Sequence, residues 1–189
     1  AASDIEFKFP FGFKELEGIH SRTDFDLSSH EKFSGKKLQY FDPEINERYI
    51  PYVVETSIGL DRMFLAVFSH SLQEEALENG TTRTVLKLPA VLAPTKAAIL
   101  PLVKKDGLPE IARKIVEDLK WEFNVDYDEK DAVGRRYRRQ DAIGTPFCIT
   151  IDDEGLNNDI FTIRDRDTME QISLSKEQLV PYLLEKLYY

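Results

Sequence analysis

Glu55, Ser57 and Arg62 lie within one short segment, and their side chains suit the binding of an amine and of a phosphate. A carboxylate and a hydroxyl can hold a small ammonium group, and a guanidinium matches phosphate oxygens. Residues 52–54 predict a strand, in which alternate side chains share a face, so Glu55 and Ser57 are expected to point the same way. Gly59 allows the backbone to approach a ligand closely. Taken alone, the segment fits an ordinary strand, turn and helix with surface charges equally well.

The elements that would position these side chains lie in residues 1–80. Four stretches have the composition of strands, and they are residues 5–9, 15–19, 37–41 and 49–55. Residues 30–35 read as a loop. Apolar residues recur with helical spacing from Leu60 to about Leu77, and Asn79-Gly80 is expected to end that helix.

The second half alternates strands and helices, which predicts a mixed sheet flanked by helices. The expected strands are residues 95–102, 123–127, 147–151, 160–164 and 169–174. The expected helices begin at Pro109, at a cap formed by Asp131, and at a capping box of Ser175 with Gln178. Gly144 is expected to end the second of them. Residues 152–159 read as a polar connection between strands.

The composition, with 42% hydrophobic and 31% charged residues among 189, is typical of a globular protein with one large or two small domains. We expect two, over residues 1–80 and 84–189. The sequence has no apolar run long enough to span a bilayer and no visible signal peptide, so a cytoplasmic protein without a membrane partner is expected. The single cysteine, Cys148, excludes an internal disulfide and lies in a buried-strand pattern, which favours a packed thiol over a nucleophile.

Positive charge is concentrated in one short stretch, although the chain has a net charge of −9. That net charge disfavours a nucleic-acid binder that relies on bulk electrostatics. The stretch holds four arginines, namely Arg135, Arg136, Arg138 and Arg139. Because helical spacing spreads them around the helix, we expect some to pair with nearby acids (Asp131, Asp141 or Glu170) and others to meet RNA phosphates. Arg164 and Arg166 are further candidates, since recognition of unpaired bases needs polar groups and stacking. Structural ion pairs remain an equal alternative for all of them.

Several of these segments resemble class II aminoacyl-tRNA synthetases. Residues 54–62 are similar to motif 3, in the form Glu-x-Ser-x-Gly-x-x-Arg of glycyl-tRNA synthetases. Residues 15–27 resemble that family's strand before motif 3, and residues 133–147 and 164–171 resemble its anticodon-binding domain. The resemblance covers nearly the whole chain in order. Thr56 stands where the family usually has proline, which loosens the turn but keeps both neighbouring polar side chains.

The resemblance implies an α/β fold class, with an α+β catalytic remnant built on an antiparallel sheet followed by a mixed-sheet α/β anticodon-binding domain. It implies a ligase that activates glycine with ATP to glycyl-adenylate and transfers it to tRNA(Gly). The implied cofactors are ATP and Mg²⁺, and the full-length enzyme is expected to be a cytoplasmic homodimer.

The resemblance also implies roles for individual residues. The glycine site would comprise Glu55, Thr56, Ser57, Ile58 and Gly59. The ATP site would comprise Glu15, Leu16, Gly59, Leu60, Asp61 and Arg62. Arg62 and Glu15 would be catalytic: Arg62 by stabilising the triphosphate, Glu15 by holding the ATP-bound magnesium ion. The candidate tRNA contacts are Arg135, Arg138, Arg164 and Arg166.

Motifs 1 and 2 of class II synthetases are not found in this sequence. We therefore expect a carboxy-terminal piece of a glycyl-tRNA synthetase that is inactive by itself. One alternative is a non-catalytic protein built on synthetase parts, such as an accessory subunit, but it leaves the joint pattern of Glu15, Glu55, Ser57 and Arg62 unexplained. Another is a free-standing RNA-binding module of residues 84–189, which leaves the motif 3 half unexplained.

Overall fold

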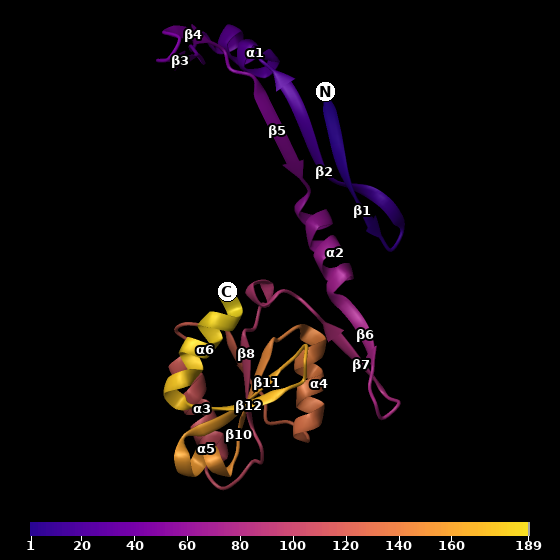
Figure 1. The fold of residues 1–189 in the computed structure, drawn as a ribbon, viewed down its shortest axis with the longest axis vertical. Helices are drawn as coiled ribbons and strands as arrows, with labels where there is room; N and C mark the ends of the chain where they lie inside the picture. Colours follow the sequence, from indigo (N-terminus) through magenta and orange to yellow (C-terminus); the bar gives the residue numbers. More distant parts are fainter. Residues whose placement is uncertain (189) are drawn as a thin grey trace. The chain divides into compact units, whose positions relative to one another are not determined.

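The computed structural model describes residues 1–188 and divides into two compact units, Ala1–Ser69 and a second that begins at His70 (Figure 1). The predicted domain boundary between residues 80 and 84 stays a prediction. The strands of the first unit are β1 (Ala2–Phe9), β2 (Gly12–Thr23), β3 (Tyr40–Asp42), β4 (Glu47–Tyr49) and β5 (Val53–Ile58). Its helix is α1 (Phe25–Ser34), and α2 (Leu60–Ser71) leads on to the second unit.

The first unit is built on an antiparallel sheet of order β1-β2-β5, with β3 and β4 forming a separate hairpin. The expected strands at 5–9 and 15–19 are confirmed within β1 and β2, whereas the later two are shorter and shifted. The expected loop at residues 30–35 is wrong, because residues 30–34 continue α1 and Gly35 closes it at φ 69°. Since α1 buries none of its side chains, its sequence lacks the apolar periodicity by which helices are recognised.

The long helix expected up to about Leu77 is also wrong, because α2 ends at Ser71. The next residues form β6 (Leu72–Ala76), which pairs with β7 (Thr82–Leu86) in an antiparallel hairpin. Asn79-Gly80 lies in the hairpin turn, with Gly80 at φ 77°. Strand pairing here overrides the helical preference of the sequence Gln-Glu-Glu-Ala.

The second unit contains a five-stranded mixed sheet of order β12-β11-β10-β8-β9, in which β10, β8 and β9 are parallel. The strands are β8 (Ala97–Pro101), β9 (Val125–Tyr127), β10 (Phe147–Ile151), β11 (Ile160–Asp165) and β12 (Gln171–Ser175). The helices are α3 (Leu108–Leu119), α4 (Val133–Ile143), α5 (Asp153–Asn158) and α6 (Lys176–Tyr188), with a 3₁₀ turn η1 (Ala90–Leu92). The two units together confirm the predicted fold class.

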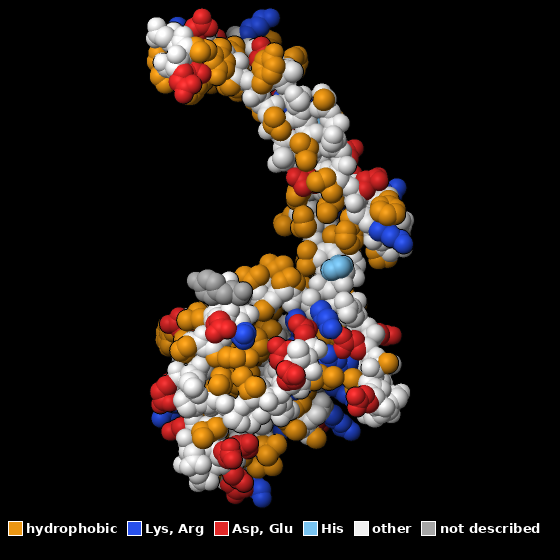
Figure 2. Space-filling model, viewed as in Figure 1, with side chains coloured by type: hydrophobic (Ala, Val, Ile, Leu, Met, Phe, Trp, Pro, Cys, Tyr) orange, Lys and Arg blue, Asp and Glu red, His pale blue; other side chains and the backbone are white. Residues whose placement is uncertain are grey.

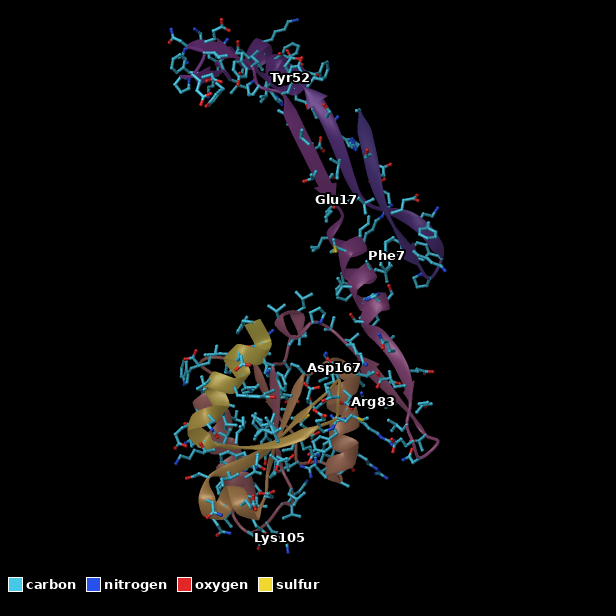
Figure 3. The ribbon with its side chains drawn as sticks, viewed as in Figure 1. Phe7, Glu17, Tyr52, Arg83, Lys105 and Asp167 are labelled. Atoms are coloured by element: carbon cyan, nitrogen blue, oxygen red, sulfur yellow. The ribbon has the colours of Figure 1, made fainter. Side chains whose placement is uncertain are left out.

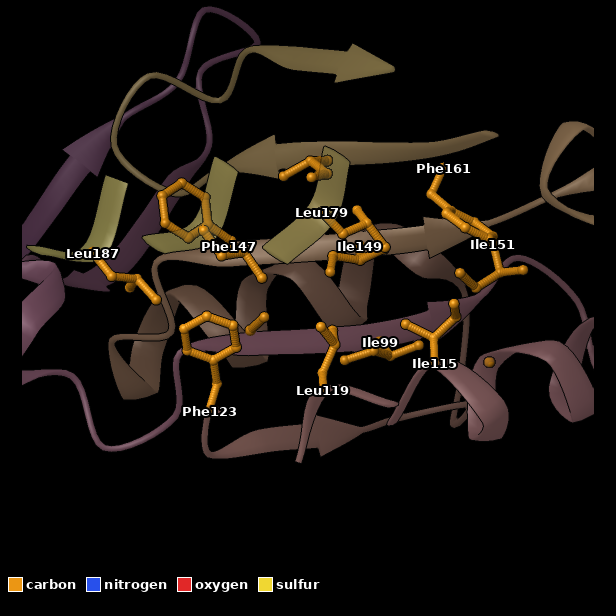
Figure 4. Packing of buried hydrophobic residues seen from close by; sticks show 14 of the residues in the cluster. Ile99, Ile115, Leu119, Phe123, Phe147, Ile149, Ile151, Phe161, Leu179 and Leu187 are labelled. Atoms are coloured by element: carbon orange, nitrogen blue, oxygen red, sulfur yellow. The ribbon is translucent and has the colours of Figure 1, made fainter. Parts of the chain in front are cut away.

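The main core lies on one face of this sheet, under α3 and α6 (Figure 4). The other face is covered by α4, whose Tyr137 packs on Ala98, Leu100 and Cys148. Burial raises the pKa of the Cys148 thiol to about 12, and the side chain is 1% exposed, so the predicted packed thiol is confirmed.

Two of the helix ends predicted in the second unit are confirmed and one is wrong. Gly144 ends α4 at φ 86°, as predicted, and the Ser175 N–H donates to Gln178 Oε1 at 2.9 Å before α6. The predicted cap by Asp131 is wrong, because Ala132 precedes α4 and gives it no side-chain cap. The predicted polar connection at 152–159 is a short helix that the Asp152 carboxylate caps. Within residues 1–188, none of the helices has the length and apolar character needed to cross a membrane.

Candidate functional site

One face of the β1-β2-β5 sheet carries the predicted glycine-binding side chains. Glu55 lies directly opposite His20 in the strand register, and Ser57 lies opposite Gly18. Because alternate residues of a strand share a face, these four residues face the same side. Thr56 and Ile58 belong to the other face. The structure thus brings Glu55 and Ser57 together but separates them from two of the residues predicted beside them.

Glu55 is hydrogen-bonded to Arg22, a residue that the sequence did not indicate as part of the site. The Nε–H of Arg22 donates to the Glu55 carboxylate, and Asp26 lies 3.8 Å from the same nitrogen. The hydrogen bond from Arg22 holds the pKa of Glu55 below its usual value, and the same bond raises the pKa of Arg22. Arg22 thus fixes the position of a carboxylate that, like any exposed glutamate, is ionised at neutral pH and can accept an ammonium group.

The position of Arg22 depends on a bulge in β2. The pairing of β2 with β5 shifts between Ser21 and Thr23, so that Arg22 is the extra residue. Thr23 has φ 54°, which is unusual for a β-branched residue, and its hydroxyl donates to the Arg22 carbonyl at 2.6 Å. Such bulges commonly redirect a side chain next to a functional site. A β-branched residue in this conformation leaves no recognisable pattern in a single sequence, which is why the bulge was missed.

Gly18 lies under two polar side chains of the same strand. A Cβ atom at this position would lie 2.9 Å from His20 Nε2 and 3.6 Å from Glu15 Oε1. A second register shift, between Ile5 and Glu6 of β1, leaves Leu16 as the extra residue of β2. This shift brings the Glu15 carboxylate to the side of Gly18 and His20. The absence of a side chain at Gly18 therefore keeps His20 and Glu15 close to the face that Glu55 and Ser57 share.

Arg62 lies next to the same strand. Its Nη1 donates to the Glu15 carbonyl at 2.6 Å, and its Cβ lies 3.7 Å from where a Cβ of Gly59 would be. The Gly59 carbonyl accepts the Met63 N–H at 2.9 Å and so begins α2. The structure therefore brings the Arg62 guanidinium to the backbone of Glu15, and a nucleotide site shared by the two residues stays a prediction. The side chains of Leu60 and Asp61, which were also predicted at the ATP site, are both exposed, Leu60 to 81%.

The chemistry of this face suits a small zwitterion and a polyphosphate. An ionised carboxylate, a hydroxyl and an imidazole line one part of it, and the Arg62 guanidinium lies against the backbone carbonyl of Glu15. Among residues 1–188 no three His, Cys, Asp or Glu side chains are grouped to hold a metal ion. A magnesium ion here would therefore depend on phosphate oxygens in addition to Glu15.

The arginines of α4 have four different environments. Arg136 is buried, and its guanidinium donates to the carbonyls of Pro101, Leu102 and Asp128. Arg139 pairs with Asp128 at 2.7 Å and with Asp131 at 2.9 Å, which confirms the predicted pairing with Asp131. These two arginines therefore stabilise the domain.

The other two arginines of α4 remain accessible. The Arg135 side chain is 77% exposed and lies 4.0 Å from Asp131. Arg138 is exposed, and its one side-chain hydrogen bond within residues 1–188 is a 3.5 Å contact with Thr81 Oγ1. An exposed guanidinium without a close carboxylate is available to an anionic ligand.

Asp141 pairs with arginines outside α4, which the sequence did not indicate. Arg164 donates to both Asp141 oxygens at 2.8 and 3.1 Å. Arg83, whose place in the second unit is labelled in Figure 3, donates to Asp141 Oδ2 at 3.0 Å. Arg83 also pairs with Glu75, while the Arg164 guanidinium stacks on the Tyr137 ring at 4.9 Å. Asp141 and the two arginines that donate to it, Arg83 and Arg164, are each at most 6% exposed. This group fixes β7 and β11 to α4.

Arg166 is equally committed to the interior. Its guanidinium donates to the carbonyls of Leu86, Leu88 and Gly144 and to the carboxylate of Asp167. It is 3% exposed, and all five of its N–H donors are used. Of the two alternatives for Arg164 and Arg166, the structure therefore favours the structural one over contact with tRNA, because both head groups are buried and bonded within the chain. The sequence shows the charge of these residues but not their partners.

The chain is similar to known proteins in sequence and in fold. Residues 96–186 match the family described as anticodon binding domain. The chain is 53% identical to a glycine–tRNA ligase of Chlorobaculum tepidum, over 98% of this chain and 39% of that protein. It is 54% identical to a glycine–tRNA ligase of Geobacillus kaustophilus over 99% of this chain, and 51% identical to one of Borrelia hermsii over 97%.

These relatives are longer than the chain, which spans about two fifths of their length. In fold, the chain is similar to the RNA binding domain of threonyl-tRNA synthetase from Cryptosporidium parvum. That likeness has a TM-score of 0.72 at 20% identity and covers 100% of this chain and 43% of the other. This likeness shows that the mixed sheet and its helices form a fold that also occurs in a solved structure.

Proposed function

We propose that this chain, a homologue of the glycine–tRNA ligases that contains an anticodon binding domain, serves as the part of such a ligase that binds tRNA(Gly) and contributes to the glycine and ATP pocket. The observation that carries the proposal is the convergence of Glu55, Ser57 and Glu15 on one face of the β1-β2-β5 sheet, with Arg62 tied to the Glu15 carbonyl.

In the glycine site, Glu55 and Ser57 would accept hydrogen bonds from the α-ammonium group. Arg22 supports this role because its hydrogen bond holds the Glu55 carboxylate in place. His20 lies opposite Glu55 on the same face of the sheet. Thr56, Ile58 and Gly59 would contribute their backbone, since the strand turns two of their side chains away.

In the nucleotide site, Arg62 would neutralise the triphosphate while the glycine carboxylate attacks the α-phosphorus, the bond from that phosphorus to the β-phosphate breaks, and pyrophosphate leaves. Such transfers depend on positioning and charge neutralisation more than on covalent help from the protein. Glu15 would help to hold a magnesium ion, which would supply positive charge to neutralise the phosphates. The backbone of Leu16, Leu60 and Asp61 completes the proposed contacts with ATP.

The proposed pocket is incomplete within this chain. Apolar side chains of the adjoining elements are open to solvent, with Val54 70%, Leu60 81% and Phe64 68% exposed. Surfaces of this kind are covered in a finished domain or interface. We therefore propose that the chain alone does not activate glycine. We also propose that the full-length ligase is a cytoplasmic homodimer without a membrane partner.

For tRNA, the accessible candidates are Arg135 and Arg138 on α4. The test is binding of tRNA(Gly) transcripts to this chain, measured by filter retention, with a transcript whose anticodon is replaced as the control. We expect the replacement to weaken binding at least about tenfold, or about 1.4 kcal/mol. Equal binding of the two transcripts would contradict the proposed anticodon recognition. Glycine-dependent ATP–pyrophosphate exchange should be absent from the chain alone.

A further inference from the structure

A cleft of about 310 Å³ opens between β7 and α4, both within the second unit. It is lined by Thr82, Arg83, Thr84, Arg138, Arg139 and Ala142. Figure 2 shows Lys and Arg side chains beside Asp and Glu side chains where Figure 1 places α4 and β7. Nothing in the sequence pointed to this cleft, because its two walls are about fifty residues apart in the chain.

The cleft has rigid walls. On the β7 side, Arg83 is 3% exposed and is fixed by Asp141, Glu75 and the Arg166 carbonyl. On the α4 side, Arg139 is fixed by its ion pair with Asp128. Both guanidinium groups are therefore committed to protein acceptors, and they shape the cleft without offering free charge. A cleft whose walls are held in this way needs little ordering when a ligand binds.

Arg138 supplies the free charge of the cleft. No carboxylate of residues 1–188 lies within ion-pair distance of it, in contrast to its neighbour Arg139. Its planar guanidinium offers two parallel N–H donors to a single oxyanion group.

Two hydroxyl groups lie on the opposite wall. Thr82 and Thr84 are both exposed and, as alternate residues of β7, share a face. Neither hydroxyl has a side-chain hydrogen bond to any residue in the described part of the chain, whereas Thr81 is bonded to Asn79. In the β6–β7 register Ala76 lies opposite Thr82, and Glu74 lies opposite Thr84. An anion is therefore favoured at the Thr82 end of the cleft.

We propose that this cleft binds a phosphodiester group of the tRNA backbone, with Arg138 and the Thr82 and Thr84 hydroxyls as its ligands. The proposal rests on the proposed function, since it assumes that the second unit meets RNA. Guanidinium and hydroxyl donors are the usual partners of backbone phosphates, and such contacts position a nucleic acid without reading its sequence. The β7 wall lies outside residues 96–186, so the site requires the hairpin in addition to the anticodon binding domain.

The test compares RNA binding of three variants with that of the wild-type chain across a range of salt concentrations. R138Q removes the free charge, and T82V/T84V removes both hydroxyls while keeping residues that favour a strand. K114Q, the control, removes one exposed charge from α3, which covers the other face of the sheet. We expect R138Q to weaken binding about three- to tenfold and to reduce the salt slope by about one. T82V/T84V should weaken binding without changing the slope, and K114Q should bind as wild type does.

The same measurements with the anticodon-replaced transcript separate the two proposals. A backbone site predicts that R138Q weakens both transcripts equally and leaves their affinity ratio unchanged. If R138Q and T82V/T84V bind RNA as the wild type does, the cleft proposal is overturned while anticodon recognition stands. If the wild type does not distinguish the transcripts but R138Q still weakens both, anticodon recognition fails and the cleft stands. Competition by inorganic phosphate, beyond that of chloride at equal ionic strength, with unchanged RNA binding by the variants, would identify a site for free phosphate and overturn the proposal.

Discussion

Arg22 donates its Nε–H to the carboxylate of Glu55 from the bulge of β2. The two side chains are 45% and 37% exposed, so this pair contributes to the position and charge of Glu55 more than to stability. It connects a strained backbone position, Thr23, with the residue proposed to bind an ammonium group.

Replacing Arg22 by glutamine should raise the pKa of Glu55 toward its ordinary value of 4.5, because the hydrogen bond that lowers it is lost. The stabilisation from the pair is fully present above pH 4.5 and disappears as the pH falls through the lower pKa of the folded state. The titration of the Glu55 carboxyl carbon by NMR measures this shift. Asp26→Asn is the control, since Asp26 lies farther from Arg22, at 3.8 Å. An unchanged pKa in R22Q would show that Arg22 does not control Glu55.

Gly18→Ala should leave the fold intact but displace His20, because the added Cβ would lie 2.9 Å from Nε2 at the end of a mobile side chain. We expect a stability change of at most about 1 kcal/mol, measured by urea denaturation, and a shifted His20 imidazole signal. Gly134→Ala is the matched control, because no atom lies within 4 Å of its Cβ position, and an alanine should stabilise α4 by about 0.5–1 kcal/mol. An unmoved His20 in G18A would mean that Gly18 does not set its position.

Asp141→Ala should destabilise the second unit by about 3–5 kcal/mol, because it leaves Arg164 and Arg83 buried without their shared partner. Guanidinium denaturation measures this loss. Asp131→Asn is the comparison, because asparagine tolerates the positive φ of 69° at this position and removes only the charge of a half-exposed pair with Arg139 that is worth about 0–1 kcal/mol. Losses of similar size in the two variants would argue against a special role of the buried group.

The Cys148 thiol should not react with iodoacetamide at pH 8 in the folded protein, because burial raises its pKa to about 12 and the side chain is 1% exposed. Mass spectrometry after timed exposure measures the modification. Unfolding in denaturant should restore reaction at the rate of a free thiol. Rapid modification of the folded chain would contradict the packing of α4 against β8 and β10.

Strongly patterned elements could be predicted from the sequence, and the relations between distant residues could not. The helix that follows Gly107 was recognised because Ile115 and Leu119 form a regular apolar stripe. The strands β10 and β11 were recognised from their apolar runs. In contrast, α1 and β6 depend on caps and strand pairing, which leave weak local signals.

The candidate site shows the same division. The shared face of Glu55 and Ser57 follows from strand periodicity and was predicted correctly. The roles of Arg22 and Gly18 follow from two bulges, which no local pattern revealed. For Arg164 the sequence leaves RNA contact and a structural ion pair as equal alternatives, because its partner, Asp141, lies on another element. The sequence therefore predicts the chemical groups of the site but not the hydrogen bonds and ion pairs that hold them in place.

The central claim is that Glu55, Ser57 and Arg62 belong to a glycine-activating pocket. Its most direct test is glycine-dependent ATP–pyrophosphate exchange by a chimera in which this chain replaces the matching two fifths of the Geobacillus kaustophilus ligase. We expect exchange with glycine, and a loss of about 10²-fold or more in the chimera carrying Arg62→Gln or Glu55→Gln. A folded chimera that shows no exchange, or one that keeps its activity with both substitutions, would contradict the claim.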